Sequence, residues 1–272
     1  KLEKNDFSVI ASGIGSDRLT NHNHIYIELD VTSSERCEYI LNTYQPDIIV
    51  NAAAMTDVDK CEKEKERCLE VNSDSIDSFI PYLKKNNIHY IQISTDFIFN
   101  GKKGPYIETD DCDPINFYGV SKLEAEKKIV TNNLKYTILR TSLIYGMDND
   151  GNNFLMWVRK TLMDNVELNI VDDQYRTPTY VLDLSAAILE IVKHKKYGTY
   201  HISGGENLSI FEIVCNIAKH YKLNISLVNR IKSSELNQIA KRPSRSGLKI
   251  KKAIENFNFT PTALNNALNQ IL

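Results

Sequence analysis

The chain has 272 residues, 42% of them hydrophobic and 25% charged, which is enough for one large domain or two unequal lobes with a substantial core. The formal net charge is −2, and no broad basic field or basic amphipathic segment favours nucleic acid or a membrane as a partner. The apolar runs fall well short of the ~20 residues that a membrane-spanning helix needs. Nucleic-acid binding and membrane insertion are therefore excluded as expected functions.

Cysteine and histidine usage argues against disulfides and metals. The 5 cysteines are odd in number and contain no Cys-x-x-Cys pair, which favours free thiols in a reducing cytoplasm. Cys61 and Cys68 are close enough in sequence to share a helix face, where packing is their expected role. The 6 histidines show no metal-binding spacing, and no carboxylate cluster identifies a magnesium site. We expect a cytoplasmic protein without a metal centre.

Short apolar runs alternate with helical patterns along the first half of the chain. The segments predicted as strands are 7–12, 24–29, 47–51, 89–94 and 136–141. The predicted helices are one capped by Thr32 or Ser33 that runs to about Tyr44, a long charged helix over roughly 61–85, and a helix over 117–132, preceded by a loop over 95–116. This alternation predicts βαβ units and a parallel sheet covered by helices on both faces.

After about residue 145 the alternation loosens. The segments 153–163 and 181–195 read as amphipathic helices, 198–204 as a strand and turn, and 209–221 as a helix with a capping box that joins Ser209 to Glu212. We predict an α/β fold, with a Rossmann-like doubly wound parallel sheet in residues 1–145. Residues 146–272 are expected to form mainly a smaller substrate-binding lobe, with some segments returning to the sheet.

The first residues read as the tail of a helix that leads into the strand 7–12. A doubly wound nucleotide-binding domain usually starts earlier, with a strand, a glycine-rich turn and a helix whose N-terminus holds a pyrophosphate. Gly13 and Gly15 follow the strand that we count as the second, so they are not assigned this role. We expect the first strand and its turn to precede residue 1; the alternative is a protein that has lost its phosphate-binding turn.

Residues just after each strand are candidate ligand contacts, because parallel sheets bind ligands beyond the carboxyl ends of their strands. The sequence "FYGVSK" places Tyr118 and Lys122 one turn apart on a helix face, where the ammonium is expected to lower the pKa of the phenol and allow proton exchange with a substrate oxygen. Alone, this pair is more often part of a helix surface. Ser94, Thr95 and Asp96 end a strand, and Thr95 is expected to meet Tyr118 at one substrate oxygen.

Other strand ends suit a dinucleotide. Ala53 and Ala54 allow close approach of a flat ligand, although alanine also packs well in any α/β crossover. Asp30 suits an adenine amino group, with a helix N-cap acid as the alternative. Residues 11–13 lack the acid that holds the ribose in NAD sites and have Arg18 nearby, which favours NADP(H) over NAD(H) unless Arg18 is only a solvated loop residue.

Together these segments resemble the extended short-chain dehydrogenase/reductase family, and within it the dTDP-4-dehydrorhamnose reductases. The resemblance rests on "NAAAMTDVDKCE", "ISTDFIFNG", "YIETDDCDPINFYGVSKLEAE", "LRTSLIYG", "DDQYRTPTYVLDLSAAI" and, near the end, "RPSRSGLKIKKA". The Tyr-x-x-x-Lys motif marks only the superfamily, whereas the Ser-Thr-Asp strand end and the Asp-Gln…Pro-Thr segment are more specific. The resemblance implies NAD(P)H-dependent reduction of the C4 ketone of a nucleotide-linked deoxysugar, with dTDP-4-dehydrorhamnose as substrate. A homodimer is the expected assembly.

The resemblance also implies roles for single residues. Tyr118 donates a proton to the ketone oxygen, Thr95 hydrogen-bonds the same oxygen, and Lys122 binds the nicotinamide ribose and tunes Tyr118. Asp96 lies where the family contacts sugar hydroxyls. The residues implied to line the dinucleotide are Asp30, Val31, Ala53, Ala54, Met55, Thr56, Ser94, Tyr118 and Lys122.

Two positions depart from the family pattern. Phe97 stands where the family commonly has tyrosine, and Leu143 stands where the rhamnose enzymes have a tryptophan that stacks on the sugar. Leu143 is therefore assigned to the substrate site, and the identity of the sugar stays open. Two other functions fit the motifs: an NAD-dependent sugar-nucleotide epimerase, which shows no net NADPH consumption, and a non-catalytic subunit resembling the regulatory β-subunit of methionine adenosyltransferase, which needs no proton donor.

Overall fold

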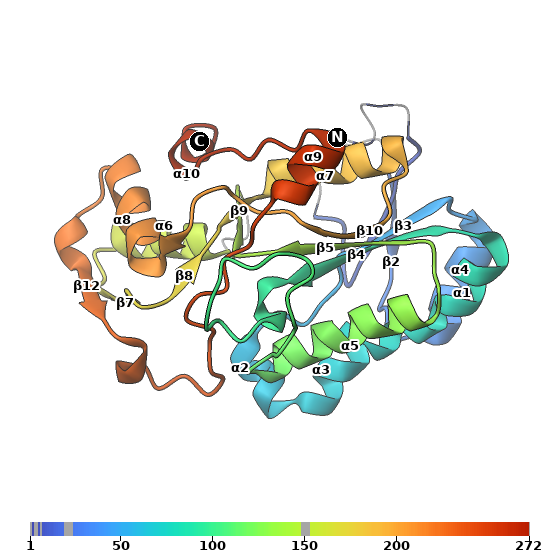
Figure 1. Cartoon of the computed structure of the whole chain (residues 1–272), viewed down its shortest axis with the longest axis horizontal. Helices are drawn as coiled ribbons and strands as arrows, with labels where there is room; N and C mark the ends of the chain where they lie inside the picture. The colour runs from blue at the N-terminus through green and yellow to red at the C-terminus, as the bar shows by residue number, and fades with distance from the viewer. Residues whose placement is uncertain (1, 3–4, 6, 19–23, 148–152, 272) are drawn as a thin grey trace.

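A parallel sheet lies at the centre of the computed structural model, which describes residues 2, 5, 7–18, 24–147 and 153–271 (Figure 1). Its four strands run in the order β10-β5-β4-β3, and β1 pairs with β2 in a separate parallel sheet. The bounds are β1 (Ile10–Gly13), β2 (Ile25–Glu28), β3 (Ile48–Asn51), β4 (His89–Thr95), β5 (Tyr136–Thr141) and β10 (Gly198–His201). The predicted α/β fold with a parallel sheet is confirmed.

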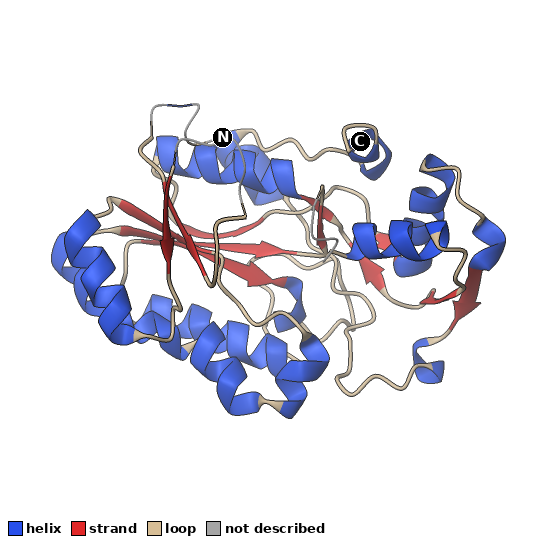
Figure 2. Ribbon diagram, turned by 180° about the vertical axis from the view of Figure 1, so that it is seen from behind, coloured by secondary structure: helices blue, strands red, loops and turns tan. Residues whose placement is uncertain are grey.

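Helices cover both faces of the central sheet (Figures 1 and 2). On one face lie α1 (Ser34–Tyr44), α2 (Val58–Lys63), α3 (Lys65–Asn72), α4 (Ile80–Asn86) and α5 (Phe117–Thr131); on the other lie α7 (Val181–His194) and α9 (Lys251–Phe257). Neighbouring residues of β4 serve the two cores: Tyr90 packs with Ile129 of α5, and Ile91 packs with Ile191 of α7. This alternation arises because successive side chains of a strand point to opposite faces of the sheet, and both faces are buried here.

A further core lies at the other end of the molecule, around Leu155, Val214 and Leu268. Its elements are α6 (Phe154–Met163), β7 (Leu168–Val171), α8 (Ile210–His220), β12 (Val228–Ile231) and α10 (Leu264–Leu268). Short strand pairs join it to the sheet: β6 (Ile144–Tyr145) with β9 (Thr179–Tyr180), and β8 (Tyr175–Arg176) with β11 (Leu208–Ser209). Single 3-10 turns are η2 (Asp74–Ser78), η3 (Asp96–Ile98), η4 (Ile225–Leu227) and η5 (Ser233–Glu235).

The helix ends that capping residues mark in the sequence are confirmed. Ser33 caps α1 by accepting a hydrogen bond from the backbone N–H of Arg36, and Ser209 forms the expected capping box with Glu212 at the start of α8. Helices α7 and α9 and strand β10 come from the second half of the chain and pack against or pair with the central sheet. The division into lobes at residue 145 stays a prediction.

The long charged helix expected over 61–85 is wrong. The chain forms α2, α3, η2 and α4 instead, because Glu64 has φ −116° and ψ 59°, outside the helical region, and interrupts the helix between α2 and α3. Cys61 and Cys68 therefore lie on different helices rather than on one face. Both are buried, and all five cysteines are free thiols, as the sequence indicates.

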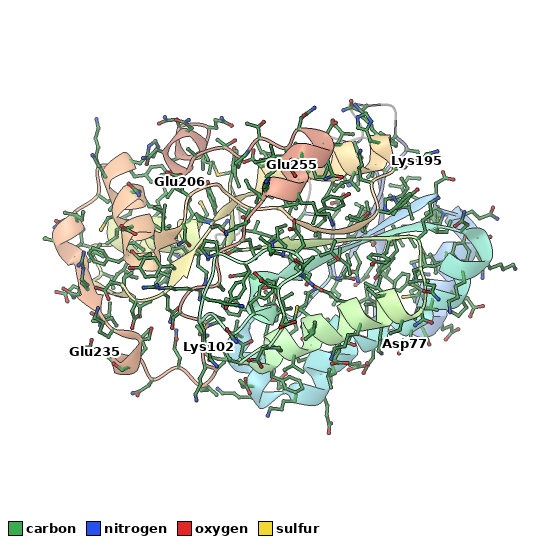
Figure 3. The ribbon with its side chains drawn as sticks, viewed as in Figure 1. Asp77, Lys102, Lys195, Glu206, Glu235 and Glu255 are labelled. Carbon is green, nitrogen blue, oxygen red and sulfur yellow. The ribbon has the colours of Figure 1, made fainter. Side chains whose placement is uncertain are left out.

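Charged side chains mark the outer surface of the molecule. Asp77, Lys195 and Glu235 lie at its periphery, away from the central sheet (Figure 3). Within the described ranges, no helix combines the length and apolar character needed to cross a membrane. The same ranges contain no group of three or more His, Cys, Asp or Glu side chains suited to a metal ion.

Two histidines are buried in the central sheet. Nε2 of His89 lies 2.7 Å from Oγ1 of Thr137, and Nδ1 of His201 lies 3.2 Å from the carbonyl oxygen of Tyr106. Burial lowers the pKa of His89 to about 4. Burial, together with the nearby cation of Arg140, lowers the pKa of His201 to about 3. Both rings are therefore neutral in the folded protein at neutral pH.

Acid is expected to destabilise this fold between pH 6.5 and 4. In that interval the unfolded chain protonates both histidines while the native state does not, so the free energy of unfolding falls by about 2–3 kcal/mol per pH unit from these groups. Urea unfolding at a series of pH values measures this slope. His89→Gln should remove about half of it, whereas His194→Gln, at an exposed position, should leave it unchanged. An unaltered slope in His89→Gln and in His201→Gln would contradict the assignment.

Candidate active site

A cavity of about 720 Å³ opens between the two sheets, beside β1 and β3. Its volume lies within the range of small-molecule and cofactor sites. Three strand ends meet there, as the predicted topology requires. The lining includes Ser12 and Gly13 from β1, Asp30 and Val31 after β2, and Asn51, Ala53 and Ala54 from the end of β3. Arg18 and Arg67 also line it.

Asp30 faces this cavity but also holds a turn. Its Oδ1 accepts hydrogen bonds from the backbone N–H (2.9 Å) and the hydroxyl (2.8 Å) of Thr32, and its Oδ2 lies 3.5 Å from Nη2 of Arg67. The hydrogen bonds from Thr32 are the main reason that the pKa of Asp30 is lowered, so the carboxylate is ionised. Because Ser33 is the N-cap of α1, the alternative interpretation of Asp30 as that cap is wrong.

Met55 and Thr56 are not among the described residues that line the cavity. The backbone of Met55 is held by Asn72, whose side chain accepts from its N–H (2.7 Å) and donates to its carbonyl (3.1 Å). Asn72 also donates to Oγ of Ser121 on α5 at 2.9 Å, which ties the end of β3 to that helix. No sequence motif marks Asn72 as a site residue. Its role is recognisable from the structure, where its amide is buried at the end of α3.

Helix α5 lies against the end of β4 because residue 119 is glycine. A Cβ atom at Gly119 would lie 2.2 Å from the carbonyl oxygen of Phe97, so a larger residue cannot occupy this position without a shift. The side chain of Asn116 fixes the start of the helix by accepting from the N–H of Gly119 at 2.8 Å. This contact brings Tyr118 to Thr95 and to Phe97, whose ring centroid lies 6.0 Å from that of Tyr118.

The pKa of Tyr118 is raised, mainly because burial disfavours the phenolate. A hydrogen bond to the side chain of Thr95 acts in the opposite direction, and the carboxylate of Asp96 adds to the rise. The expected net lowering by Lys122 is therefore wrong: in this structure the loss of solvation outweighs the hydrogen bond to Thr95, which lowers the pKa of Tyr118. A phenol with a raised pKa keeps its proton at neutral pH, which suits a proton donor.

Lys122 shares the helix face of Tyr118 and is buried, 2% exposed. Burial lowers the pKa of its ammonium to about 8. Ser94, which was expected to line the dinucleotide, donates its hydroxyl to Oε1 of Glu126 at 2.5 Å. The side chain of Ser94 therefore contacts α5, and Ser94 is not among the described residues that line the cavity.

Asp96 belongs to a buried ion pair. Nε of Arg176 lies 3.8 Å from its Oδ2, and Ser246 donates a hydrogen bond to the same oxygen. Burial raises the pKa of Asp96, while the charge of Arg176 opposes that rise. The Arg176 guanidinium also lies over the ring of Phe97, 5.1 Å from its centroid. Arg176 and Ser246 were not predicted as site residues, although both lie in segments that carry the family resemblance.

Leu143 lies between β5 and β6 with φ 41°, in the left-handed region that a leucine rarely adopts. Its carbonyl accepts from the N–H of Thr179 at 3.2 Å. Its side chain is partly buried against the core of α6 and α8. Leu143 therefore marks the passage from the sheet to the second core, and its contact with a substrate stays a prediction.

These features define the class of protein: a Rossmann-like α/β protein with a Tyr-x-x-x-Lys helix at the end of the sheet, as in short-chain dehydrogenases/reductases. The model of the RmlD substrate binding domain matches residues 2–272, and the chain belongs to this family.

Several relatives cover most of the chain. It is 33% identical over 258 residues to the dTDP-4-dehydrorhamnose reductase of Aggregatibacter actinomycetemcomitans, covering 90% of this chain and 87% of the relative. It is 34% identical to the spore coat polysaccharide biosynthesis protein SpsK of Bacillus subtilis, covering 90% and 85%. The crystal structure of a Bacillus anthracis dTDP-4-dehydrorhamnose reductase in complex with NADP superposes with a TM-score of 0.87 at 26% identity, covering 97% and 99%.

Gly119→Ala is expected to lower the free energy of unfolding by about 1–3 kcal/mol, because its Cβ would overlap the carbonyl oxygen of Phe97. In a helix without such a contact, replacing glycine by alanine would raise the free energy of unfolding by about 1 kcal/mol. A decrease in that free energy therefore indicates the clash. Urea unfolding measures the difference. Gly205→Ala is the matched control, since its Cβ would meet only Pro261 at 3.5 Å. A Gly119→Ala variant as stable as the parent would contradict this view of the α5 contact.

Proposed function

We propose that the protein is an NAD(P)H-dependent reductase of the C4 ketone of a nucleotide-linked deoxysugar, converting dTDP-4-dehydrorhamnose to dTDP-rhamnose. The observation that carries the proposal is the contact of Thr95 with Tyr118 at the end of β4, with Lys122 on the same helix face. The names of the relatives support the same reaction and substrate. The proposed location is the cytoplasm, and the proposed assembly is a homodimer.

The reduction needs a hydride at the carbonyl carbon and a proton at the carbonyl oxygen. The nicotinamide cofactor supplies the hydride when it is bound. Tyr118 donates the proton, and its raised pKa keeps that proton available. Thr95 hydrogen-bonds the same oxygen, and the positive charge of Lys122 stabilises the phenolate that Tyr118 becomes. Lys122 also binds the nicotinamide ribose.

The cavity residues fit a dinucleotide. The small side chains of Ala53 and Ala54 leave room for a flat ligand, and the ionised carboxylate of Asp30, with Val31 next to it, suits the adenine amino group. Met55, Thr56 and Ser94 are proposed to complete the dinucleotide contacts near the nicotinamide. We propose NADP(H) rather than NAD(H), since Ser12 and Arg18 line the cavity at the end of β1 and one structural relative was solved with NADP.

The sugar is proposed to meet the ion pair of Asp96 and Arg176, with Leu143 on the side of the second core. Asp96 can accept hydrogen bonds from sugar hydroxyls only through the lone pairs that Thr95, Arg176 and Ser246 leave available. Residues 146–272 are proposed to supply most of the sugar contacts, and residues 1–145 the dinucleotide contacts.

Tyr118→Phe is expected to lower kcat for ketone reduction by about 10²–10⁴-fold, because a general acid is lost. The affinity for NADPH should change little, since only the phenolic hydroxyl is removed. Assays of NADPH oxidation with dTDP-4-dehydrorhamnose measure kcat, and fluorescence titration with NADPH measures the affinity. Tyr39→Phe, at an exposed position on α1, is the control and should behave like the parent. Undiminished turnover in Tyr118→Phe would refute the mechanism.

The same assay separates the alternatives. Interconversion of sugar nucleotides without net NADPH consumption would point to an epimerase. NADPH binding without turnover of any nucleotide sugar would point to a regulatory subunit. The reductase predicts loss of one NADPH for each ketone reduced.

Arg18→Met is expected to raise the KM for NADPH by about 10–100-fold, because a charge-assisted hydrogen bond to the 2′-phosphate contributes about 1.5–3 kcal/mol. The KM for NADH should stay the same, since NADH lacks that phosphate. Steady-state assays with both cofactors measure the ratio. Arg36→Met, on the exposed surface of α1, is the control. Equal changes for NADPH and NADH would rule out the proposed role of Arg18.

A further inference from the structure

The helix face that carries Tyr118 and Lys122 continues one turn further to Glu126. This residue is buried, 4% exposed, and its carboxylate is held from a neighbouring strand by Arg140. Nε of Arg140 donates to both carboxylate oxygens at 3.1 and 3.2 Å, and Nη2 donates to Oε2 at 2.7 Å. The hydroxyl of Ser94 donates to Oε1 at 2.5 Å. Four hydrogen bonds thus fix the Glu126 carboxylate two helical turns after Tyr118.

Stability alone does not account for this arrangement. Replacing a buried ion pair by apolar residues of similar volume is often neutral or stabilising, because the desolvation of two charges offsets their attraction. Arg140 is 6% exposed and lies on β5, so both charges are withdrawn from solvent. Their position beside Lys122 offers a functional reason, since a buried ammonium needs a nearby anion to stay charged.

We propose that Glu126 is a positioning residue for the reduction: its carboxylate, fixed by Arg140 and Ser94, keeps the ammonium of Lys122 charged beside Tyr118. The working unit is then Tyr118, Lys122 and Glu126, three residues spaced by one helical turn on α5. This inference rests on the proposed function, because the role of the Lys122 charge is to stabilise the phenolate left by proton donation.

The charges around Lys122 favour this role. Burial is the largest effect and lowers the pKa of Lys122 to about 8, and Glu126 is the leading opposing charge. Cys68 on α3, when it is a thiolate, acts on the pKa of Lys122 in the same direction as Glu126. Tyr118 lies one turn before Lys122 on α5, and Arg140 contacts the carboxylate of Glu126 from β5. Without Glu126, the pKa of Lys122 falls further below 8, and the amine is neutral over more of the working range.

Glu126→Gln tests the proposal, since it keeps the shape of the side chain and removes its charge. Titration of Lys122 by NMR, in protein labelled with ¹³C at the ε carbon of lysine, should show a midpoint lower by about one pH unit or more. The alkaline limb of the pH profile of kcat/KM should move to lower pH by the same amount. A role in folding alone would lower activity at every pH and leave the limb in place.

Two further variants complete the design. Glu124→Gln removes a carboxylate from the exposed side of the same helix, where it pairs with Lys127, and should leave the Lys122 titration unchanged. If Glu126→Gln fails to fold because Arg140 is left unpaired, Glu126→Gln combined with Arg140→Met removes both buried charges. The Lys122 midpoint should still fall, because the double variant lacks the Glu126 charge that raises the pKa of Lys122 most.

The proposal is overturned if Lys122 titrates as in the parent in a folded variant without the Glu126 charge. It is also overturned if the Lys122 titration shifts while the alkaline limb of the pH profile of kcat/KM stays in place. The NMR titration needs no turnover, so it separates this inference from the proposed function. A parent protein that reduces no sugar ketone, yet shows the shifted titration, would refute the reductase reaction while the electrostatic effect of Glu126 on Lys122 would stand.

Discussion

The close contact between α5 and the end of β4 sets the geometry of the whole site. Because Gly119 has no side chain, the helix backbone reaches the carbonyl of Phe97, which a Cβ atom would prevent. Tyr118 consequently meets Thr95, and Glu126, two turns later, meets Arg140 on β5. One missing methyl group thus determines how a helix motif is aligned with two strands that are distant in sequence.

The same contact removes water, and the loss of water decides the electrostatics. Spacing on a helix predicts that a lysine lowers the pKa of a tyrosine one turn away. In the folded protein, however, the pKa of Tyr118 is raised and the pKa of Lys122 is lowered, because burial disfavours the charged form of each side chain. The resulting site holds a protonated phenol, which suits the proposed donation to a ketone, and a buried ammonium whose pKa is raised by the charge of Glu126.

Much of this organisation could be predicted from the sequence. Strong periodicity and capping residues predicted the bounds of α5 and α8 to within one residue at each end. The predicted bounds of β5 agree with the structure. The break at Glu64 was missed, because a single non-helical residue leaves the charge pattern of 61–85 intact. Strands β7 and β12 were missed as well: each is four residues long and, among the described residues, pairs with the other alone, so their stability comes from tertiary packing rather than local sequence.

Site residues differed in the same way. Tyr118, Lys122 and Thr95 follow local patterns and were predicted, whereas Arg176 is recognisable only once the fold brings it to Asp96. Arg176 comes from the second half of the chain, and the proton-transfer residues come from the first. If Arg176 and Leu143 contact the sugar as proposed, a change at either residue alters which sugar fits without disturbing the contact of α5 with β4. On the proposed function, this separation would allow the chain to keep the reaction chemistry of its family while Phe97 and Leu143 depart from the residues that are common in the family at these positions.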